Sequence, residues 1–229
     1  MRRREFLTIS SSMLGGVLVY SLDRKASLLT AGSRELGRAE NDKTVRIPLR
    51  FFTEQEAVIV AAAAGRIFPS DKSGPGAKEA GVAIYVDRQL AGPYGRDAHR
   101  YTQGPFEENA AAEFGYQGAA TPREIYRTAL KGLAGFPRLS ASEQDEALRK
   151  IEASNFFALL RLHTIEGMFC DPLHGGNADM VGWQLIGYPG PRMNNADDID
   201  RHFGEAFRPK AVRLREVAGH EVRGSEEEK

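Results

Sequence analysis

The sequence has a single cysteine, Cys170, among its 229 residues. Cysteine-ligated iron–sulfur clusters, CxxCH haem attachment and intramolecular disulfides each need at least two cysteines, so none of them can be built within this chain. A Walker loop and a GxSxG elbow are also missing. Gly74 and Gly76 begin a dinucleotide-type glycine pattern, but Glu79 stands where the third glycine is needed. The sequence therefore shows no motif for redox or hydrolytic chemistry of its own.

Neither sign of charge dominates the chain. The 31 basic and 31 acidic residues balance, so no long-range field points to nucleic acid as a partner. Removal of residues 1–32, which hold five basic and two acidic side chains, would leave 26 basic and 29 acidic residues and a net charge of −3. The body of the protein is weakly acidic, and no nucleic acid is expected among its partners.

The first 20 residues resemble a twin-arginine export signal. Arg3 and Arg4 are followed by one residue and then by Phe6 and Leu7, which is the order typical of this signal. An apolar stretch diluted by serine and glycine continues to Tyr20, and it is too short to span a bilayer comfortably. The pattern predicts export to the periplasm through the twin-arginine translocase. The alternative is that these arginines only end a cytosolic helix.

Residues 1–32 are therefore interpreted as a signal segment, and the polar residues 33–50 as a flexible lead into the folded body. Thr30, Ala31 and Gly32 offer small side chains for cleavage by a signal peptidase. An uncleaved N-terminal anchor remains the alternative.

The folded body is expected to be mostly α-helical. Thr53 with Glu56 and Ser140 with Glu143 have the spacing of capping boxes, and Asn155 is expected to cap a further, strongly apolar helix. Together with proline and glycine stop signals, these features predict helices over residues 54–67, 77–90, 122–133, 141–151 and 156–169.

No alternating strand pairs and no internal repeat are evident, so the predicted fold is a single helical domain over residues 51–193. Long ordered loops rich in glycine and aromatic residues are expected to interrupt it. Residues 94–120 are predicted to form one such loop, with one helical turn near residues 107–114. Residues 194–229 are a C-terminal extension, which either forms helices or wraps a partner.

One group of side chains has a spacing that would suit a metal ion. His163 and Glu166 would share a face of the last helix, and Asp171 and His174 follow in the next turn or loop. The alternative is that His163 is a hydrogen-bonded core residue of an apolar helix. We favour that alternative and predict no catalytic residue, bound cofactor or metal in this chain.

Cys170 and the loops after it are candidates for contact with a partner. A lone thiol in an oxidising compartment often pairs with another chain, so Cys170 is a candidate for an intermolecular disulfide, with a buried free thiol as the alternative. Trp183 and Tyr188 lie in glycine-rich loops, where they either fill the chain's own core or anchor a partner surface. The candidate interface residues are Asp171, His174, Asn177, Trp183 and Tyr188.

Several unusual motifs follow one another between Phe51 and Gly190, at residues 51–57, 66–69, 74–82, 84–90, 156–157, 163–167, 171–172, 175–177, 182–183 and 186–190. In this order they closely resemble the small subunit, subunit 3, of membrane-bound gluconate 2-dehydrogenase. The resemblance covers the predicted helical domain and is specific, because the motifs recur in the same sequence.

The resemblance implies a non-catalytic subunit of a periplasmic, membrane-associated complex that oxidises a sugar, sugar acid or related alcohol. FAD would be held by a large flavoprotein subunit of the glucose-methanol-choline type, and haem c by a multihaem cytochrome where a third subunit is present. Because the twin-arginine route moves folded proteins, the chain would bind its partner, support its maturation and carry it across the membrane. The competing hypothesis is an independent helical metalloenzyme that uses His163, Glu166 and His174.

Overall fold

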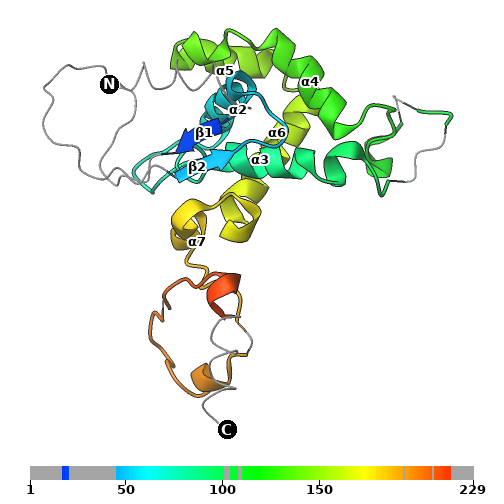
Figure 1. Ribbon diagram of the computed structural model, residues 1–229. Coiled ribbons are helices and arrows are strands. Elements are labelled where there is room, and N and C mark those ends of the chain that lie inside the picture. Colours follow the sequence, from blue (N-terminus) through cyan, green and yellow to red (C-terminus); the bar gives the residue numbers. More distant parts are fainter. Residues whose placement is uncertain are drawn as a thin grey trace, which may run out of the picture.

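The computed structural model describes residues 17–20, 45–100, 104–107, 110–192, 194–207 and 209–217. Within these ranges the protein is mostly helical, as the sequence predicts (Figure 1). The α-helices are α2 (Glu54–Ile67), α3 (Val82–Ala91), α4 (Pro122–Gly132), α5 (Ala141–Lys150), α6 (Asn155–Phe169) and α7 (Val181–Ile186). Short 3-10 helices lie between and after them: η1 (Tyr94–Arg96), η2 (Ala112–Phe114), η3 (Phe136–Arg138), η4 (Pro172–His174), η5 (Ala178–Met180) and η6 (Ala196–Asp198). No helix in the described ranges is long and apolar enough to cross a bilayer.

Capping boxes open three of these helices. The hydroxyl groups of Thr53, Thr121 and Ser140 each accept a hydrogen bond from the backbone N–H three residues on, and the glutamate at that position reaches back. The predictions for α2, α4 and α5 are thus confirmed. At α6 the predicted cap was one residue late, because the Ser154 hydroxyl accepts from the Phe157 N–H and Asn155 is already helical.

The start of α3 differs from the prediction, which placed it at residue 77. Gly81 adopts the left-handed conformation, with φ 70° and ψ 27°, and this breaks the helical path before Val82. The glycine-rich loop expected around Trp183 and Tyr188 differs as well, because α7 occupies its first part. Six residues are too few to show a helical period in the sequence.

A two-stranded ladder lies outside the helices. Strand β1 (Val17–Tyr20) pairs antiparallel with β2 (Val45–Pro48), with Val17 opposite Pro48. The first strand falls in the expected signal segment and the second in the expected lead. This pair was not predicted from the sequence, because four-residue strands are too short for alternation to be recognised.

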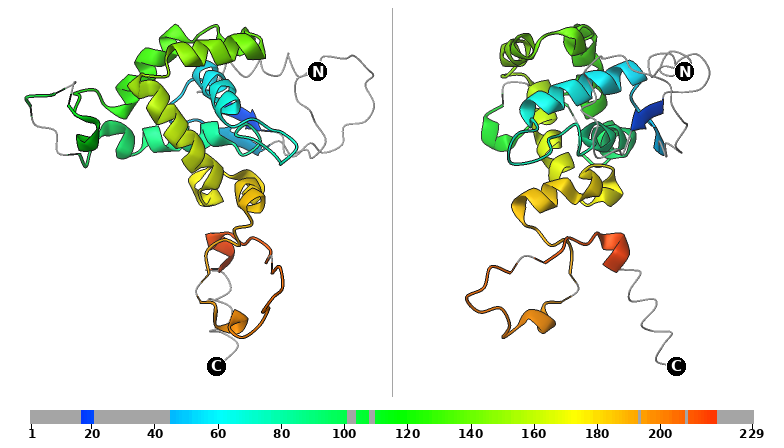
Figure 2. Two further views of the ribbon diagram at one scale, coloured as in Figure 1. Left: turned by 180° about the vertical axis from the view of Figure 1, so that it is seen from behind. Right: turned by 90° about the vertical axis from the view of Figure 1, so that its left-hand side faces the viewer.

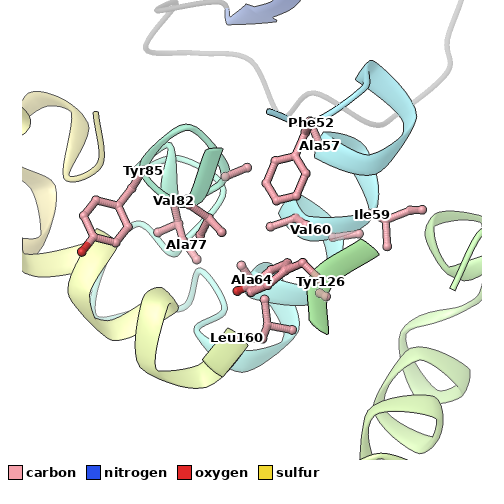
Figure 3. Packing of buried hydrophobic residues seen from close by; sticks show 14 of the residues in the cluster. Phe52, Ala57, Ile59, Val60, Ala64, Ala77, Val82, Tyr85, Tyr126 and Leu160 are labelled. Carbon is pink, nitrogen blue, oxygen red and sulfur yellow. The ribbon is translucent and has the colours of Figure 1, made fainter. Parts of the chain in front are cut away.

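The core lies where α6 packs against α2, α3 and α4. Figure 3 shows Tyr126 of α4 and Leu160 of α6 beside Ala64 and Val60 of α2. All four are buried, and the small side chains on α2 allow the bulkier ones to approach closely. The approach of α6 to α3 is also tight, because a Cβ atom on Gly167 would lie 3.1 Å from the Tyr85 ring.

Polar contacts fix the helices relative to one another. Asp87 of α3 is 1% exposed, and its carboxylate accepts hydrogen bonds from the backbone N–H groups of Arg50, Phe51 and Phe52 at 2.8, 2.9 and 2.8 Å. Three such bonds offset the cost of burying a carboxylate. Arg66 of α2 forms a two-pronged ion pair with Asp145 of α5, at 2.7 and 2.8 Å.

Candidate functional site

His163 of α6 lies in the core with 1% of its surface exposed. Its Nδ1 atom is 2.8 Å from the Tyr126 hydroxyl of α4, and its Nε2 atom is 2.9 Å from the Tyr94 hydroxyl of η1. The Tyr126 ring stacks on the imidazole, whereas the Tyr94 ring meets it edge-on. Both ring nitrogens of His163 are therefore occupied by tyrosines of this chain.

The hydrogen bonds of His163 are those of a neutral imidazole. Burial lowers the pKa of His163 to about 4. A neutral imidazole has one N–H donor and one bare nitrogen, so one tyrosine hydroxyl accepts a hydrogen bond from the ring and the other donates one to it. Burial also raises the pKa of Tyr94 to about 12 and that of Tyr126 well above its usual value. These three side chains form an uncharged unit that joins η1, α4 and α6.

The structure does not assemble the metal site that the sequence spacing suggested. The Glu166 carboxylate accepts a hydrogen bond from the Tyr85 hydroxyl at 2.9 Å, and His174 is exposed in η4. No three histidine, cysteine, aspartate or glutamate side chains in the described ranges lie close enough together to hold a metal ion. His163 is a hydrogen-bonded core residue, which is the alternative that the sequence favoured.

Asn177 fixes the loop that follows α6. Its side-chain amide donates to the Cys170 carbonyl and accepts from the Gly182 N–H, both at 2.8 Å, and its own N–H donates to the Gly167 carbonyl at 2.7 Å. The two glycines beside this loop, Gly176 and Gly182, have no space for a side chain. A Cβ atom on Gly176 would lie 2.2 Å, and one on Gly182 1.9 Å, from a carbonyl oxygen of α6. Asn177 is fully buried, so its role is to close this loop onto α6.

Trp183 and Tyr188 have different roles, although the sequence predicted the same two alternatives for both. Trp183 is 4% exposed, and its indole N–H donates to the Phe169 carbonyl at 2.7 Å, so it fills this chain's own core. Tyr188 packs edge-on against the Trp183 ring but is 43% exposed. The structure thus places Trp183 inside and leaves Tyr188 accessible to a partner.

A mostly apolar surface groove of about 490 Å³ lies at the C-terminal end of α6. Asp171 is its acidic member, and its carboxylate accepts from the N–H groups of Leu173 and Leu214, both at 2.9 Å. Ile186 and Leu214 are 59% and 45% exposed. The groove is lined by Phe169, Asp171, Trp183, Ile186, Tyr188, Pro191 and Leu214. Three of the five candidate interface residues therefore gather around one groove.

Cys170 caps the C-terminal end of α6 beside this groove, and its side chain is partly buried. Burial raises the pKa of the thiol to about 11, so the group is protonated at neutral pH and slow to attack a disulfide. The intermolecular disulfide remains a prediction. The signal residues Arg3, Arg4, Phe6 and Leu7 lie outside the described residues.

Sequence reasoning missed the partners of the buried polar groups. Tyr94 and Tyr126 lie 69 and 37 residues from His163, and Asp87 lies 35 to 37 residues from the amides that it binds. The only signal was that a histidine in an apolar helix needs hydrogen-bond partners from elsewhere in the fold.

The fold and these contacts define a helical protein in which buried His163, Asn177 and Asp87 form structural hydrogen bonds within the chain. Exposed apolar side chains surround one groove. Residues 54–190 match the sequence family described as Gluconate 2-dehydrogenase subunit 3, and the chain belongs to this family. None of the curated proteins and none of the solved structures compared with the chain matches it. The match runs from the start of α2 to residue 190, so it includes Phe169, Trp183 and Tyr188 of the groove, and it confirms the family that the motifs indicated. Membership implies association with other subunits of a gluconate dehydrogenase complex.

Proposed function

We propose that this chain is the non-catalytic small subunit of an exported flavoprotein dehydrogenase and binds the FAD-containing large subunit. The family match over residues 54–190 carries the proposal. The geometry of His163 supports the non-catalytic part, because a histidine with both nitrogens bound by tyrosines and a pKa of about 4 is a poor proton-transfer group near neutral pH. Catalysis then belongs to the large subunit, which would be of the glucose-methanol-choline type.

The N-terminal segment gives the proposed subunit a second role. Arg3, Arg4, Phe6 and Leu7 match the order of a twin-arginine signal. The flavoprotein partner would have no export signal of its own. A chain that carries this signal and binds the folded partner would support its maturation and take it to the periplasm. The complex would be membrane-associated and oxidise a sugar, sugar acid or alcohol, and a multihaem cytochrome c would accept electrons where a third subunit is present.

The test is recovery of the tagged full-length chain from the periplasm of its native cells, followed by flavin absorbance and gel analysis with and without reductant. The proposal predicts that a flavoprotein co-purifies with the chain. If the two proteins separate only after reduction, Cys170 forms a disulfide with the flavoprotein. If they separate without reductant, the subunit role stands and the disulfide hypothesis is wrong. Recovery of a colourless monomer alone would overturn the proposed function.

A further inference from the structure

Residues 191–211 form what we call the C-terminal arm. The arm starts directly after residue 190, where the family match ends. It leaves the helical body beyond α7 and extends away from it, as the orange segment does in Figure 1 and in both views of Figure 2. None of its described residues is buried. The arm therefore lies outside the matched residues, and its described side chains take no part in the core.

Both ends of the arm are tied to the helical body. The Val212 N–H donates to the Pro189 carbonyl at 3.0 Å, and the Leu214 N–H donates to the Asp171 carboxylate at 2.9 Å. A Cβ atom on Gly190 would lie 1.9 Å from the Val212 carbonyl oxygen, so the outgoing and returning chains are in contact. These contacts make the arm a loop with a closed base, and the base lies beside the groove at the end of α6.

The outer part of the arm has local order but exposes its large apolar side chains. Arg192 and Asp198 form an ion pair, and the rings of His202 and Phe207 stack 3.9 Å apart. Ile199 is 65%, Phe203 81% and Phe207 44% exposed. Three such side chains within nine residues form an apolar surface that association would remove from water.

We propose that the C-terminal arm is a docking element that inserts Ile199, Phe203 and Phe207 into an apolar cleft of the large flavoprotein subunit. This inference rests on the proposed function, which supplies the partner. The arm has about 20 residues, which is what one side of a standard protein interface contains. It is also continuous with the groove, because Pro191 and Leu214 at its base line that groove. The arm and the groove together form one binding face.

The charge of the arm favours a protein partner over a membrane. Its four acidic residues, Asp197, Asp198, Asp200 and Glu205, are balanced by four basic ones, Arg192, Arg201, Arg208 and Lys210. A segment without a basic excess gains no net electrostatic attraction to anionic lipid headgroups, whereas a protein cleft with side chains of both signs at its rim would complement it. The cleft on the large subunit is thus expected to be apolar inside and to carry charges of both signs at its edge.

The experiment compares two triple variants of the tagged full-length chain in native cells. The arm variant carries Ile199→Ala, Phe203→Ala and Phe207→Ala. The control variant carries Val58→Ala, Leu139→Ala and Leu162→Ala, which remove large apolar side chains of 47%, 38% and 48% exposure elsewhere. Reductant is present throughout, so that no disulfide holds the subunits together. A further variant replaces residues 194–207 by a glycine-serine linker of equal length.

The arm variant and the linker variant are expected to recover at least tenfold less flavoprotein than the unmodified chain, while the control variant recovers a similar amount. The circular dichroism and melting temperature of the arm and linker variants should be unchanged, because the arm residues whose burial the structure describes are all at least partly exposed. Equal recovery by the arm variant and the unmodified chain overturns the arm inference and leaves the proposed function standing. Recovery of no flavoprotein by the unmodified chain overturns the proposed function itself.

The same purified variants test two other binding partners for the arm, a membrane and a second copy of the chain. Binding of the purified chain to anionic phospholipid vesicles that is lost in the arm variant, with flavoprotein recovery intact, would assign the arm to the membrane. A dimer of the purified chain that the arm variant converts to a monomer, again with flavoprotein recovery intact, would assign it to a second copy. Either result contradicts the proposed docking to the large subunit.

Discussion

Acidification should destabilise this protein through His163. The pKa of this buried imidazole is about 4 in the folded state, against an ordinary value of 6.5. Between these two values the unfolded chain binds a proton that the folded chain does not. Stability is therefore fully present above about pH 6.5 and is lost as the pH falls towards 4.

The size of this effect follows from the shift in pKa. Each pKa unit corresponds to about 1.4 kcal/mol, so the full shift is worth about 3 kcal/mol, of which about 2.5 kcal/mol is lost between pH 7.5 and pH 4.5. His163 is 1% exposed, so solvent screening reduces this value little. A loss of this size is a large part of the 5–15 kcal/mol that typically stabilises a folded domain.

The assay is urea unfolding at pH 7.5 and pH 4.5 for the unmodified protein and His163→Gln. Glutamine keeps a donor and an acceptor but does not titrate, and it costs about 1–3 kcal/mol at pH 7.5 because it cannot satisfy both tyrosine hydroxyls. Carboxylates such as Asp145, whose pKa the hydrogen bond from Arg66 lowers, add acid sensitivity to both proteins and cancel in the difference. The unmodified protein should lose about 2.5 kcal/mol more than the variant.

The control for this assay is His174→Gln, which changes an exposed histidine of η4 and should keep the pH dependence of the unmodified protein. Equal losses of stability in the unmodified protein and in His163→Gln would refute a neutral, buried His163.

Three further predictions concern Asp87, Gly182 and Cys170. Asp87→Asn should lower the free energy of unfolding by about 1–3 kcal/mol in urea, because one amide oxygen replaces a carboxylate that binds three N–H groups; no change would contradict the role of that carboxylate. Gly182→Ala should prevent stable folding, since its Cβ atom would lie 1.9 Å from a carbonyl oxygen, whereas Gly132→Ala, with open space around it, should melt no lower than the unmodified protein. Cys170→Ser should abolish any reductant-sensitive heterodimer band on a gel, and persistence of that band would exclude Cys170 as its origin.

The sequence predicted the local structure better than the contacts between elements. Capping boxes at Thr53 and Ser140 use side chains three residues apart, so both could be recognised in the sequence. The left-handed turn at Gly81, which delays α3, depends on how the preceding loop packs, and glycine alone does not reveal it. The start and end of the helices were therefore predictable only where the signal was local.

The candidate site shows the same division. A single histidine in the apolar sequence of α6 indicated a buried, hydrogen-bonded residue, but its partners Tyr94 and Tyr126 come from distant segments that only the fold brings together. Trp183 and Tyr188 are neighbours in sequence and in space, yet one is buried and the other is exposed. Composition could not separate them, because burial depends on the loop closure that Asn177 enforces.

The most direct test of the proposed subunit role is the location of flavin-containing dehydrogenase in native cells that express either the unmodified chain or a variant with Arg3→Lys and Arg4→Lys. The double variant keeps the positive charge but removes the arginine pair. If the chain binds and exports a flavoprotein, both proteins should disappear together from the periplasm and accumulate together in the cytoplasm. A flavoprotein that reaches the periplasm in normal amount while the variant chain stays behind would contradict that role.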